Sequence, residues 1–335
     1  MYITMSIPYT FIELCAGCGG LSSGLIKAGL KPILLNDQNK DCCKTLMKNH
    51  PDIKIIQGNL EDIDYKEYIC KADILVGGVP CQSFSQSGKR KGLQDPRGNL
   101  MLNFIDIVHL LKPKIFIIEN VKGLITHDKG NTLIKILDNI QSRNLYKTQY
   151  RCLNASKHGV PQKRERIFII GILNTIESSF IFPQDENVIV PLKDVLYDVP
   201  ESLGAKYTQQ KINLFRQIPQ GGCWINLPTE LQMQYLGNAY HSGGGKRGYL
   251  YRLSMDKTAP TLLCVPSQKQ TERCHPLEER PLTVREYARI QTFDDNYLFE
   301  GSLSSQYRQI GNAVPVELGR RLGLKIIDLL NKIKT

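Results

Sequence analysis

One cysteine stands at a point where glycine and proline interrupt an apolar run. In the stretch ILVGGVPCQSFSQSGKRKGL (residues 74–93), the run 74–76 predicts a buried strand, which the glycines and proline end at Cys81. Side chains that follow such a strand lie at the carboxyl end of a sheet, where open α/β folds carry out their chemistry. The nearby basic residues favour the thiolate form. Cys81 is therefore predicted to be an exposed nucleophile and not a buried structural thiol.

A carboxylate is expected beside this thiol. Residues 114–118 form another predicted strand, which ends in ENV at residues 119–121. Because neighbouring strand ends meet at one edge of the sheet, Glu119 and Cys81 would pair a nucleophile with an acid. The competing interpretation, that Glu119 caps the following helix, leaves its place opposite the thiol unexplained.

A glycine-rich turn near the start of the chain predicts a nucleotide site. Strand, glycine turn, helix, strand and acid follow one another over residues 9–14, 17–20, 21–28, 32–35 and Asp37. This is the order of a nucleotide-binding βαβ unit, in which the acid accepts hydrogen bonds from ribose hydroxyls. Ser22 replaces the last glycine of the dinucleotide fingerprint, which weakens a nicotinamide or flavin assignment. An ordinary tight turn at Gly17 and a helix N-cap at Asp37 remain alternatives.

A second polar turn follows the next predicted strand, residues 53–57. In the tripeptide Gly58-Asn59-Leu60, the amide can bond the amino group of an adenine and the leucine can pack on its ring. The alternative is a simple turn that contains asparagine.

The elements that position these residues alternate between strands and helices. Further strands are predicted over 73–76 and 166–172, and helices over 101–111 and 132–143. This alternation predicts an α/β fold, a doubly wound and mostly parallel Rossmann-like sheet. After residue 178 short strands and many Pro, Gly, Gln and Asn residues predict a smaller, loop-rich second domain. Helical patterns return from Thr283, and an amphipathic helix over 316–333 is expected to pack on the first domain.

The composition bounds the class of protein. The 335 residues carry a net charge of +11, which suits a polyanionic partner, although a solvated basic face would give the same surplus. Ten scattered cysteines without a secretory signal favour a reduced, cytoplasmic protein, and no apolar run is long enough to cross a membrane. The pair Cys15 and Cys18 has the spacing of a zinc site but lacks a second pair, so no metal is expected.

Six motifs together resemble those of the cytosine-C5 DNA methyltransferases, in order and over nearly the whole chain. They are FIELCAGCGG (11–20), GGVPCQSFS (77–85), ENV (119–121), QKRER (162–166), REYAR (285–289) and QIGNAVP (309–315). The resemblance implies a catalytic and cofactor-binding domain at 1–182, a target-recognition domain at 183–279, and a hinge and closing helix at 280–335.

The resemblance also implies catalytic roles. Cys81 adds to C6 of a cytosine that is flipped out of the duplex, and Glu119 bonds N3 and the exocyclic amine. Arg166 holds the cytosine carbonyl oxygen, and Arg164 supports the loop that carries Cys81. Alternation along the QKRER strand places Gln162, Arg164 and Arg166 on one face, which favours these roles over a surface charge run.

S-adenosylmethionine is the implied methyl donor. The implied cofactor residues are Phe11, Leu14, Gly17, Gly19, Asp37, Asn59, Leu60, Pro80, Asn312 and Val314. Two of these depart from the family pattern, which commonly has Glu at the position of Asp37 and Asp at that of Asn59. Asp37 keeps the carboxylate, whereas Asn59 keeps only an acceptor, so the contact to the adenine amine is the least secure part of the transfer.

Double-stranded DNA is the implied substrate. The expected DNA contacts are Gln82, Ser85, Ser87, Lys89, Arg97, Lys246, Arg247 and Thr261. The last three belong to a glycine-rich loop, 243–248, and to a Thr-Leu pair of the recognition region. A disordered surface loop is the alternative for 243–248.

Other functions are weighed against this one. Methylation of cytosine in RNA uses the same core motifs, but the sizeable recognition region favours duplex DNA. A DNA-binding protein without catalysis would not need Cys81 and Glu119, and a nicotinamide oxidoreductase conflicts with Ser22. The implied enzyme is monomeric, belongs to a restriction-modification system and forms no stable complex with a cognate endonuclease.

Overall fold

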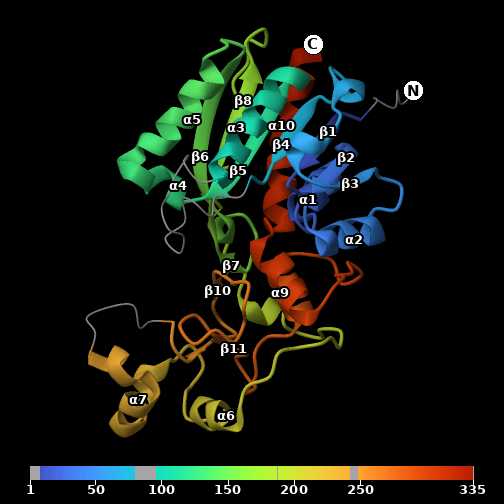
Figure 1. Ribbon diagram of the computed structural model, residues 1–335. Coiled ribbons are helices and arrows are strands. Elements are labelled where there is room, and N and C mark those ends of the chain that lie inside the picture. The colour runs from blue at the N-terminus through green and yellow to red at the C-terminus, as the bar shows by residue number, and fades with distance from the viewer. Residues whose placement is uncertain (1–7, 80–95, 187, 242–247, 335) are drawn as a thin grey trace.

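The computed structural model describes residues 8–79, 96–186, 188–241 and 248–334. Its centre is a seven-stranded sheet with the strand order β3-β2-β1-β4-β5-β8-β6 (Figure 1). The strands are β1 (Thr10–Leu14), β2 (Lys31–Asp37), β3 (Ile55–Gln57), β4 (Ile74–Gly77), β5 (Ile115–Val121), β6 (Tyr146–Asn154) and β8 (Glu165–Leu173). Neighbours from β3 to β5 are parallel, and β8 runs antiparallel to both β5 and β6. The α/β fold with a mostly parallel sheet is therefore confirmed.

Helices cover both faces of this sheet because its strands are apolar on both faces. One face packs on α1 (Gly20–Ala28) and α10 (Val316–Lys334), and the other on α3 (Pro96–Leu111) and α5 (Asn131–Gln141). Alternate residues of one strand serve the two cores: Phe11 lies in the first and Ile12 in the second, both without exposed surface. The closing helix α10 contacts α1 and shares the first core with the sheet.

Two features of the sheet differ from the sequence-based prediction. Strand β6 was not predicted, because its residues YKTQYRCLN mix polar and apolar types and only two of the nine are buried. The strand predicted over 166–172 is present as β8, but it is antiparallel to its neighbours. The remaining helices of this part are α2 (Lys40–Asn49) and the single turn α4 (Gly123–Thr126).

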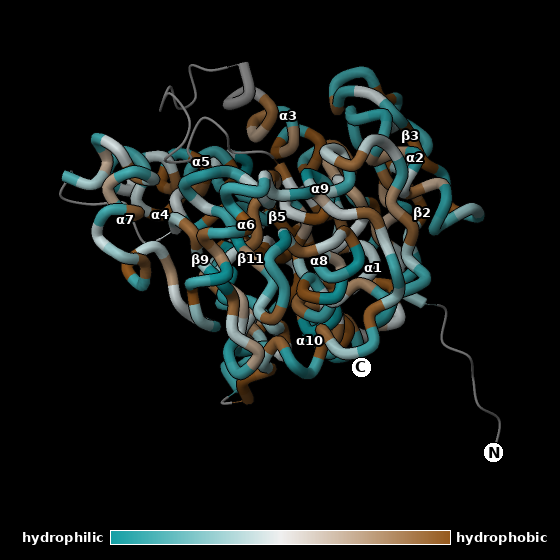
Figure 2. Tube along the Cα trace, turned by 90° about the horizontal axis from the view of Figure 1, so that it is seen from below, coloured by the Kyte–Doolittle hydropathy of each residue, from teal (hydrophilic) through white to brown (hydrophobic). Residues whose placement is uncertain are grey.

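The region from residue 183 to 279 contains little regular structure. Besides short 3-10 helices, its described elements are α6 (Gln209–Phe215), α7 (Thr229–Leu236), β9 (Tyr251–Arg252), β10 (Ala259–Pro260) and β11 (Arg273–Cys274). In Figure 1 α6 and α7 lie away from the sheet, while β10 pairs with β7 (Gln162–Lys163) close below it. Hydrophobic residues occur there in short stretches between hydrophilic ones (Figure 2). The domain boundaries at 182 and 279 stay a prediction.

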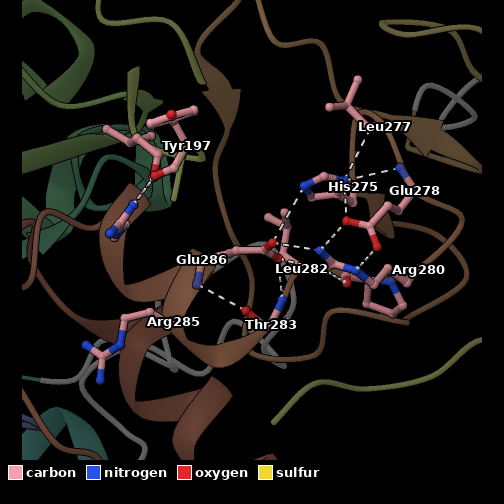
Figure 3. A network of polar contacts seen from close by, with 12 residues as sticks. Tyr197, His275, Leu277, Glu278, Arg280, Leu282, Thr283, Arg285 and Glu286 are labelled. Atoms are coloured by element: carbon pink, nitrogen blue, oxygen red, sulfur yellow. Dashed lines mark hydrogen bonds and ion pairs between the residues drawn. The ribbon is translucent and has the colours of Figure 1, made fainter. Parts of the chain in front are cut away.

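A polar network connects this region to the next helix, α8 (Val284–Ile290) (Figure 3), and α9 (Leu303–Asn312) follows α8 in the chain. Glu286 closes a capping box with Thr283 at the start of α8 and accepts two bonds of 2.8 Å from the Arg280 guanidinium. The same guanidinium donates to Glu278. Burial lowers the pKa of His275, whose Nδ1 accepts two backbone N–H groups, so this ring lies neutral within the network.

No helix in the described part of the chain is both long and apolar enough to span a membrane.

Candidate active site

A cavity of about 400 Å³ opens at the carboxyl edge of the sheet. Successive strands deliver residues to its wall: Asp37 ends β2, Gly58 follows β3, and Glu119 lies near the end of β5. The opposite wall comes from α9 and the turn after it, and includes Asn312 and Val314. The sheet therefore brings the predicted nucleotide residues and the predicted catalytic carboxylate into one cavity, as the doubly wound fold requires.

The glycine turn and Asp37 form one unit. The N–H of Gly17 donates to Oδ2 of Asp37, and that of Asn39 donates to Oδ1, both at 2.8 Å. Gly17 and Gly19 have φ values of +57° and +82°, which favour glycine. The N-cap of α2 is Asn39, so the alternative that Asp37 caps this helix is wrong. Burial raises the pKa of Asp37, and the two N–H donors lower it.

The Asn59 side chain is oriented by a neighbouring acid. Its Nδ2 donates to Asp62 at 2.9 Å, so the amide oxygen is the atom left to accept a bond from an amino group. Leu60 is buried and lines the cavity beside it. Although Asn59 stands where the family commonly has Asp, its amide oxygen is therefore still available to accept a hydrogen bond from an adenine amino group.

Three of the predicted cofactor residues do not line the cavity. Phe11 and Leu14 are fully buried in the two cores, and Gly19 packs where an added Cβ would lie 2.7 Å from the Tyr297 hydroxyl. Cys15 lines the cavity instead, and its φ of +54° turns the chain out of β1. Its position directly after a predicted strand was the signal that the sequence offered.

Glu13 and α9 supply further lining residues that the motifs did not single out. Glu13 is 2% exposed, and burial, with a smaller contribution from the Glu119 and Asp37 charges, raises its pKa to about 8. Arg308 and Gln309 face the cavity from the last turns of α9. Core residues flank these positions in the sequence, on β1 and on α9, so only the three-dimensional arrangement distinguishes them from packing residues.

Glu119 and Arg166 form an ion pair at the cavity. Strands β5 and β8 pair antiparallel, and this pairing sets the Arg166 Nε 3.0 Å from the Glu119 Oε1. Both side chains line the cavity, and each exposes less than a sixth of its surface. Burial raises the pKa of Glu119, while Arg166 and Arg164 partly oppose this rise. The carboxyl group is thus able to hold a proton more readily than an exposed glutamate.

Arg164 is almost completely buried and points to the other wall. Its Nη2 donates to the backbone oxygen of Asn312 at 3.1 Å. The alternation predicted for the QKRER strand is present in burial, since Gln162 and Arg164 are buried and Lys163 and Glu165 are exposed. The predicted support of the Cys81 loop concerns residues outside the described part of the chain.

Several predicted residues lie outside the described residues, and for Arg97 only the backbone, in α3, is described. They are Pro80, Cys81, Gln82, Ser85, Ser87, Lys89, Lys246 and Arg247. Val79, immediately before this stretch, lines the cavity. The Thr261 hydroxyl donates to the Lys163 oxygen at 2.7 Å, which ties the recognition region to the strand that leads to Arg166.

The family model for C-5 cytosine-specific DNA methylases matches residues 9–328. The chain belongs to this family. Among curated relatives, the Escherichia coli Type II methyltransferase M.Eco47II is 46% identical over 97% of this methylase and 80% of the relative. The Staphylococcus aureus enzyme M.Sau96I is 44% identical over 97% and 77%, respectively. The methylase is thus an enzyme of the DNA cytosine-5 methyltransferase class.

Solved structures share its fold. A protein described as a prophage-encoded DNA modification methyltransferase from E. coli matches with a TM-score of 0.73 at 24% identity, over 96% of this methylase and 99% of that chain. The Schizosaccharomyces pombe Dnmt2 methyltransferase matches with a TM-score of 0.68 at 16% identity, over 98% and 100%. At these identities the likeness concerns the fold alone.

Proposed function

We propose that the protein transfers a methyl group from S-adenosylmethionine to C5 of a cytosine in a specific duplex DNA site, through a covalent bond between Cys81 and C6. The observation that carries this proposal is the shared cavity, in which Asp37 and the glycine turn face the Glu119–Arg166 pair. Val79, two residues before Cys81 in the sequence, also lines this cavity. These residues support a cofactor site beside an acid partner for the thiol.

The cysteine addresses the poor nucleophilicity of cytosine C5. The Cys81 thiolate forms a bond to C6, and the electron pair of the C5–C6 double bond moves toward C5 and the N3 side of the ring. C5 would then bond the methyl carbon while the bond between that carbon and the donor sulfur breaks and leaves its electron pair on sulfur. A base takes the C5 proton, the C5–H electron pair restores the C5–C6 double bond, and the thiolate leaves with the electron pair of its bond to C6. A base inside a duplex is inaccessible to this attack, so the cytosine is flipped out.

Glu119 stabilises the electron density that moves toward N3. Its raised pKa suits a group that supplies a proton to N3 during the addition and recovers it during the elimination. Arg166, 3.0 Å from this carboxylate, has further N–H groups with which to hold the cytosine carbonyl oxygen. The arginine both orients the acid and limits the rise of its pKa.

The cavity walls suit the methyl donor. S-adenosylmethionine, when bound, supplies an electrophilic methyl group on a cationic sulfonium. Asp37 lines the cavity and favours a cation there, whereas Glu13 keeps its proton below about pH 8 and Glu119 is paired with Arg166. Asp37 is the acceptor for ribose hydroxyls, the Asn59 oxygen accepts from the adenine amine, and Leu60 packs on the ring. Asn312 and Val314 close the opposite side.

The biological role proposed is modification within a restriction-modification system. Support comes from the relatives M.Eco47II, M.PspPI and M.Sau96I, all of which carry the name Type II methyltransferase. The net charge of +11 supports binding to the phosphate backbone of duplex DNA. The protein is proposed to act as a monomer, without stable contact to an endonuclease.

The decisive experiment measures transfer of a tritiated methyl group from S-adenosylmethionine to duplex DNA, with tRNA in parallel. Bisulfite sequencing then maps the methylated cytosine. The proposal expects label in duplex DNA at one recurring sequence and none in tRNA. Label in tRNA alone would make the protein an RNA methyltransferase, and label in neither would overturn the proposal.

A further inference from the structure

Two buried glutamines far apart in the sequence are joined by one hydrogen bond. Gln162 belongs to β7, and Gln291 follows the last residue of α8. Neither side chain has exposed surface, and Nε2 of Gln162 donates to Oε1 of Gln291 at 3.0 Å. A buried amide needs partners for its remaining polar atoms, so the other ends of both side chains show what the pair connects.

Both outer ends bond to the backbone. The N–H of Leu262 donates to Oε1 of Gln162 at 3.0 Å. Nε2 of Gln291 donates to the carbonyl oxygens of Ile310 and Ala313, at 2.7 and 3.3 Å. We call this continuous path, from the Leu262 N–H through Gln162 and Gln291 to the two carbonyls, the amide relay.

The backbone groups fix the direction of the amide relay. A peptide N–H only donates and a peptide carbonyl only accepts, so Gln162 must present its oxygen to Leu262 and Gln291 must present its nitrogen to Ile310. The facing atoms are then a nitrogen of Gln162 and an oxygen of Gln291, which bond. Turning either amide around would place like atoms opposite one another. A substitution that removes one polar atom cannot be compensated by rotation of the other side chain.

One end of the amide relay lies in the recognition region. Residues 259–264 run along β7 and are fixed there by the bonds from Ala259 N–H to the Pro161 oxygen and from the Thr261 hydroxyl to the Lys163 oxygen. The other end lies in the wall of the cavity, because Ala313 lines it. The amide relay is therefore a buried connection between the expected base-reading segment and the expected cofactor site.

Two contacts near the amide relay hold the same parts together. Cys264 donates to Oδ1 of Asn312 at 3.0 Å, and Asn312 also lines the cavity. A Cβ added at Gly311 would lie 2.9 Å from the backbone nitrogen of Cys264, so the segment and the wall touch directly. A shift of either one must displace the other, since close-packed interiors do not deform independently.

We propose that Gln162 and Gln291 are positioning residues that couple binding of the cofactor to binding of the DNA site. This proposal rests on the function proposed above. When DNA fixes segment 259–264, the amide relay holds the Ile310 and Ala313 carbonyls, and with them the wall at Asn312, in the geometry that receives the cofactor. Linkage requires the effect to be reciprocal, so bound cofactor strengthens DNA binding by the same factor.

The test measures affinity for S-adenosylhomocysteine, the product form of the donor, which permits no turnover. Titration calorimetry is carried out on the full-length protein, alone and with a saturating duplex that carries the mapped site. We expect the duplex to tighten binding about fivefold or more in the unaltered protein, and this ratio to fall to about 1 in Gln162→Met and in Gln291→Met. The double variant should have the same ratio as either single variant, because one broken link already interrupts the path.

Gln232→Met is the matched control. Gln232, in α7, also donates to two backbone carbonyls, those of Ile225 and Leu227, and among the described residues neither bond leads to the cavity. Its substitution should leave the ratio unchanged. Should a methionine variant fail to fold, as judged by circular dichroism, Gln162→Asn tests the same link, because its amide is one methylene shorter and cannot reach both Leu262 and Gln291.

A ratio near 1 in the unaltered protein would overturn the coupling, as would a ratio that Gln162→Met and Gln291→Met both retain. A purely structural role would lower the melting temperature and leave the ratio as it is. The proposed function fails separately, and only if the unaltered protein methylates no cytosine in duplex DNA.

Discussion

The sheet region and the recognition region place their polar residues by different means. In the sheet, strands of up to nine residues fix each side chain through backbone ladders, and Glu119 and Arg166 meet because β5 and β8 pair in register. Between residues 183 and 279 the described strands have two residues each, and side chains hold the backbone instead. The comparison teaches that backbone pairing positions Glu119 and Arg166 at the cavity, whereas individual side chains hold the segments between residues 183 and 279.

Glu272 illustrates the second arrangement. It is fully buried in the recognition region, where it accepts bonds from the Tyr235 hydroxyl at 2.6 Å and the Leu250 N–H at 3.1 Å. Lys211 lies 2.7 Å from its second oxygen. One carboxylate thus joins three segments that share no sheet. A region built in this way can change its loops without disturbing the catalytic sheet.

The largest effect is expected at Cys81. Cys81→Ala should lower methyl transfer by roughly three orders of magnitude or more, because the covalent step is lost, while DNA binding is retained. Single-turnover methylation and gel-shift binding measure the two properties. A duplex with 5-fluorocytosine at the target should trap a covalent complex with the unaltered protein, and an active enzyme that traps none would argue against addition at C6.

Glu119→Gln is the next largest change and tests the backbone-positioned chemistry. The amide keeps the shape but cannot supply a proton to N3, so the single-turnover rate should fall by about 10²-fold to 10³-fold. Affinity for S-adenosylhomocysteine should stay nearly constant, because Asp37 and the glycine turn are untouched. Equal rates for the two proteins would reduce Glu119 to a structural partner of Arg166.

The sequence predicted the sheet region far better than the recognition region. Strand β1, helix α1 and strand β2 were predicted to within a few residues, because the hydrophobic periodicity and the glycines that separate these elements indicate the same boundaries. Strand β6 was missed because its outer position removes the apolar signal, and the reversal of β8 leaves no mark in local pattern. Long-range pairing decides both features.

The candidate site shows the same limit. Asp37, Asn59 and Glu119 lie at or just beyond the carboxyl ends of their strands, so the motif order alone predicted their shared edge. Phe11 was assigned to the cofactor site, but its side chain packs in the hydrophobic core. Glu13, on the same strand, lines the cavity and was not assigned. Successive residues of a strand point to opposite faces of the sheet. Whether a given face meets a cavity or a helix depends on tertiary packing, which the local sequence pattern does not specify.

Arg280→Met tests whether the junction between residues 183–279 and α8 depends on individual side chains, because Arg280 joins Glu278 to Glu286. Glu286 would lose both 2.8 Å bonds while it stays 6% exposed, so the free energy of unfolding should fall by about 2 kcal/mol. The matched variant is Lys114→Met, which removes the 2.7 Å partner of the half-buried Asp73 in the sheet region. Because the sheet ladder remains there, urea unfolding should show a smaller loss, and equal losses would erase the contrast.

Arg247 and Arg97 separate base reading from phosphate contact. Arg247→Ala should reduce discrimination between the mapped site and single-base variants by about 1–3 kcal/mol. Arg97→Ala should weaken binding to all sequences alike and flatten the salt dependence. Thr261→Val is a third variant for the test of base reading. It also removes the hydroxyl that bonds the Lys163 backbone oxygen. Binding across a salt series checks all three, and full discrimination in both Arg247→Ala and Thr261→Val would place the specificity determinants elsewhere.

The smallest effect concerns the cost of the site in the sheet region. Glu13 has a pKa of about 8 in the folded protein because it is buried, against 4.5 for an ordinary glutamate. The folded state therefore binds the extra proton between these pH values, so stability is fully present below pH 4.5 and declines as the pH rises to 8. Glutamine stays neutral, so Glu13→Gln should be more stable than the unaltered protein at pH 8, by about 1 kcal/mol once water in the cavity is allowed for. The difference should shrink toward pH 5 in urea unfolding. If Glu13→Gln were less stable than the unaltered protein at pH 8, the Glu13 carboxylate would be ionised and stabilised by a partner. Burial of Glu13 in the cavity wall would then not lower the free energy of unfolding.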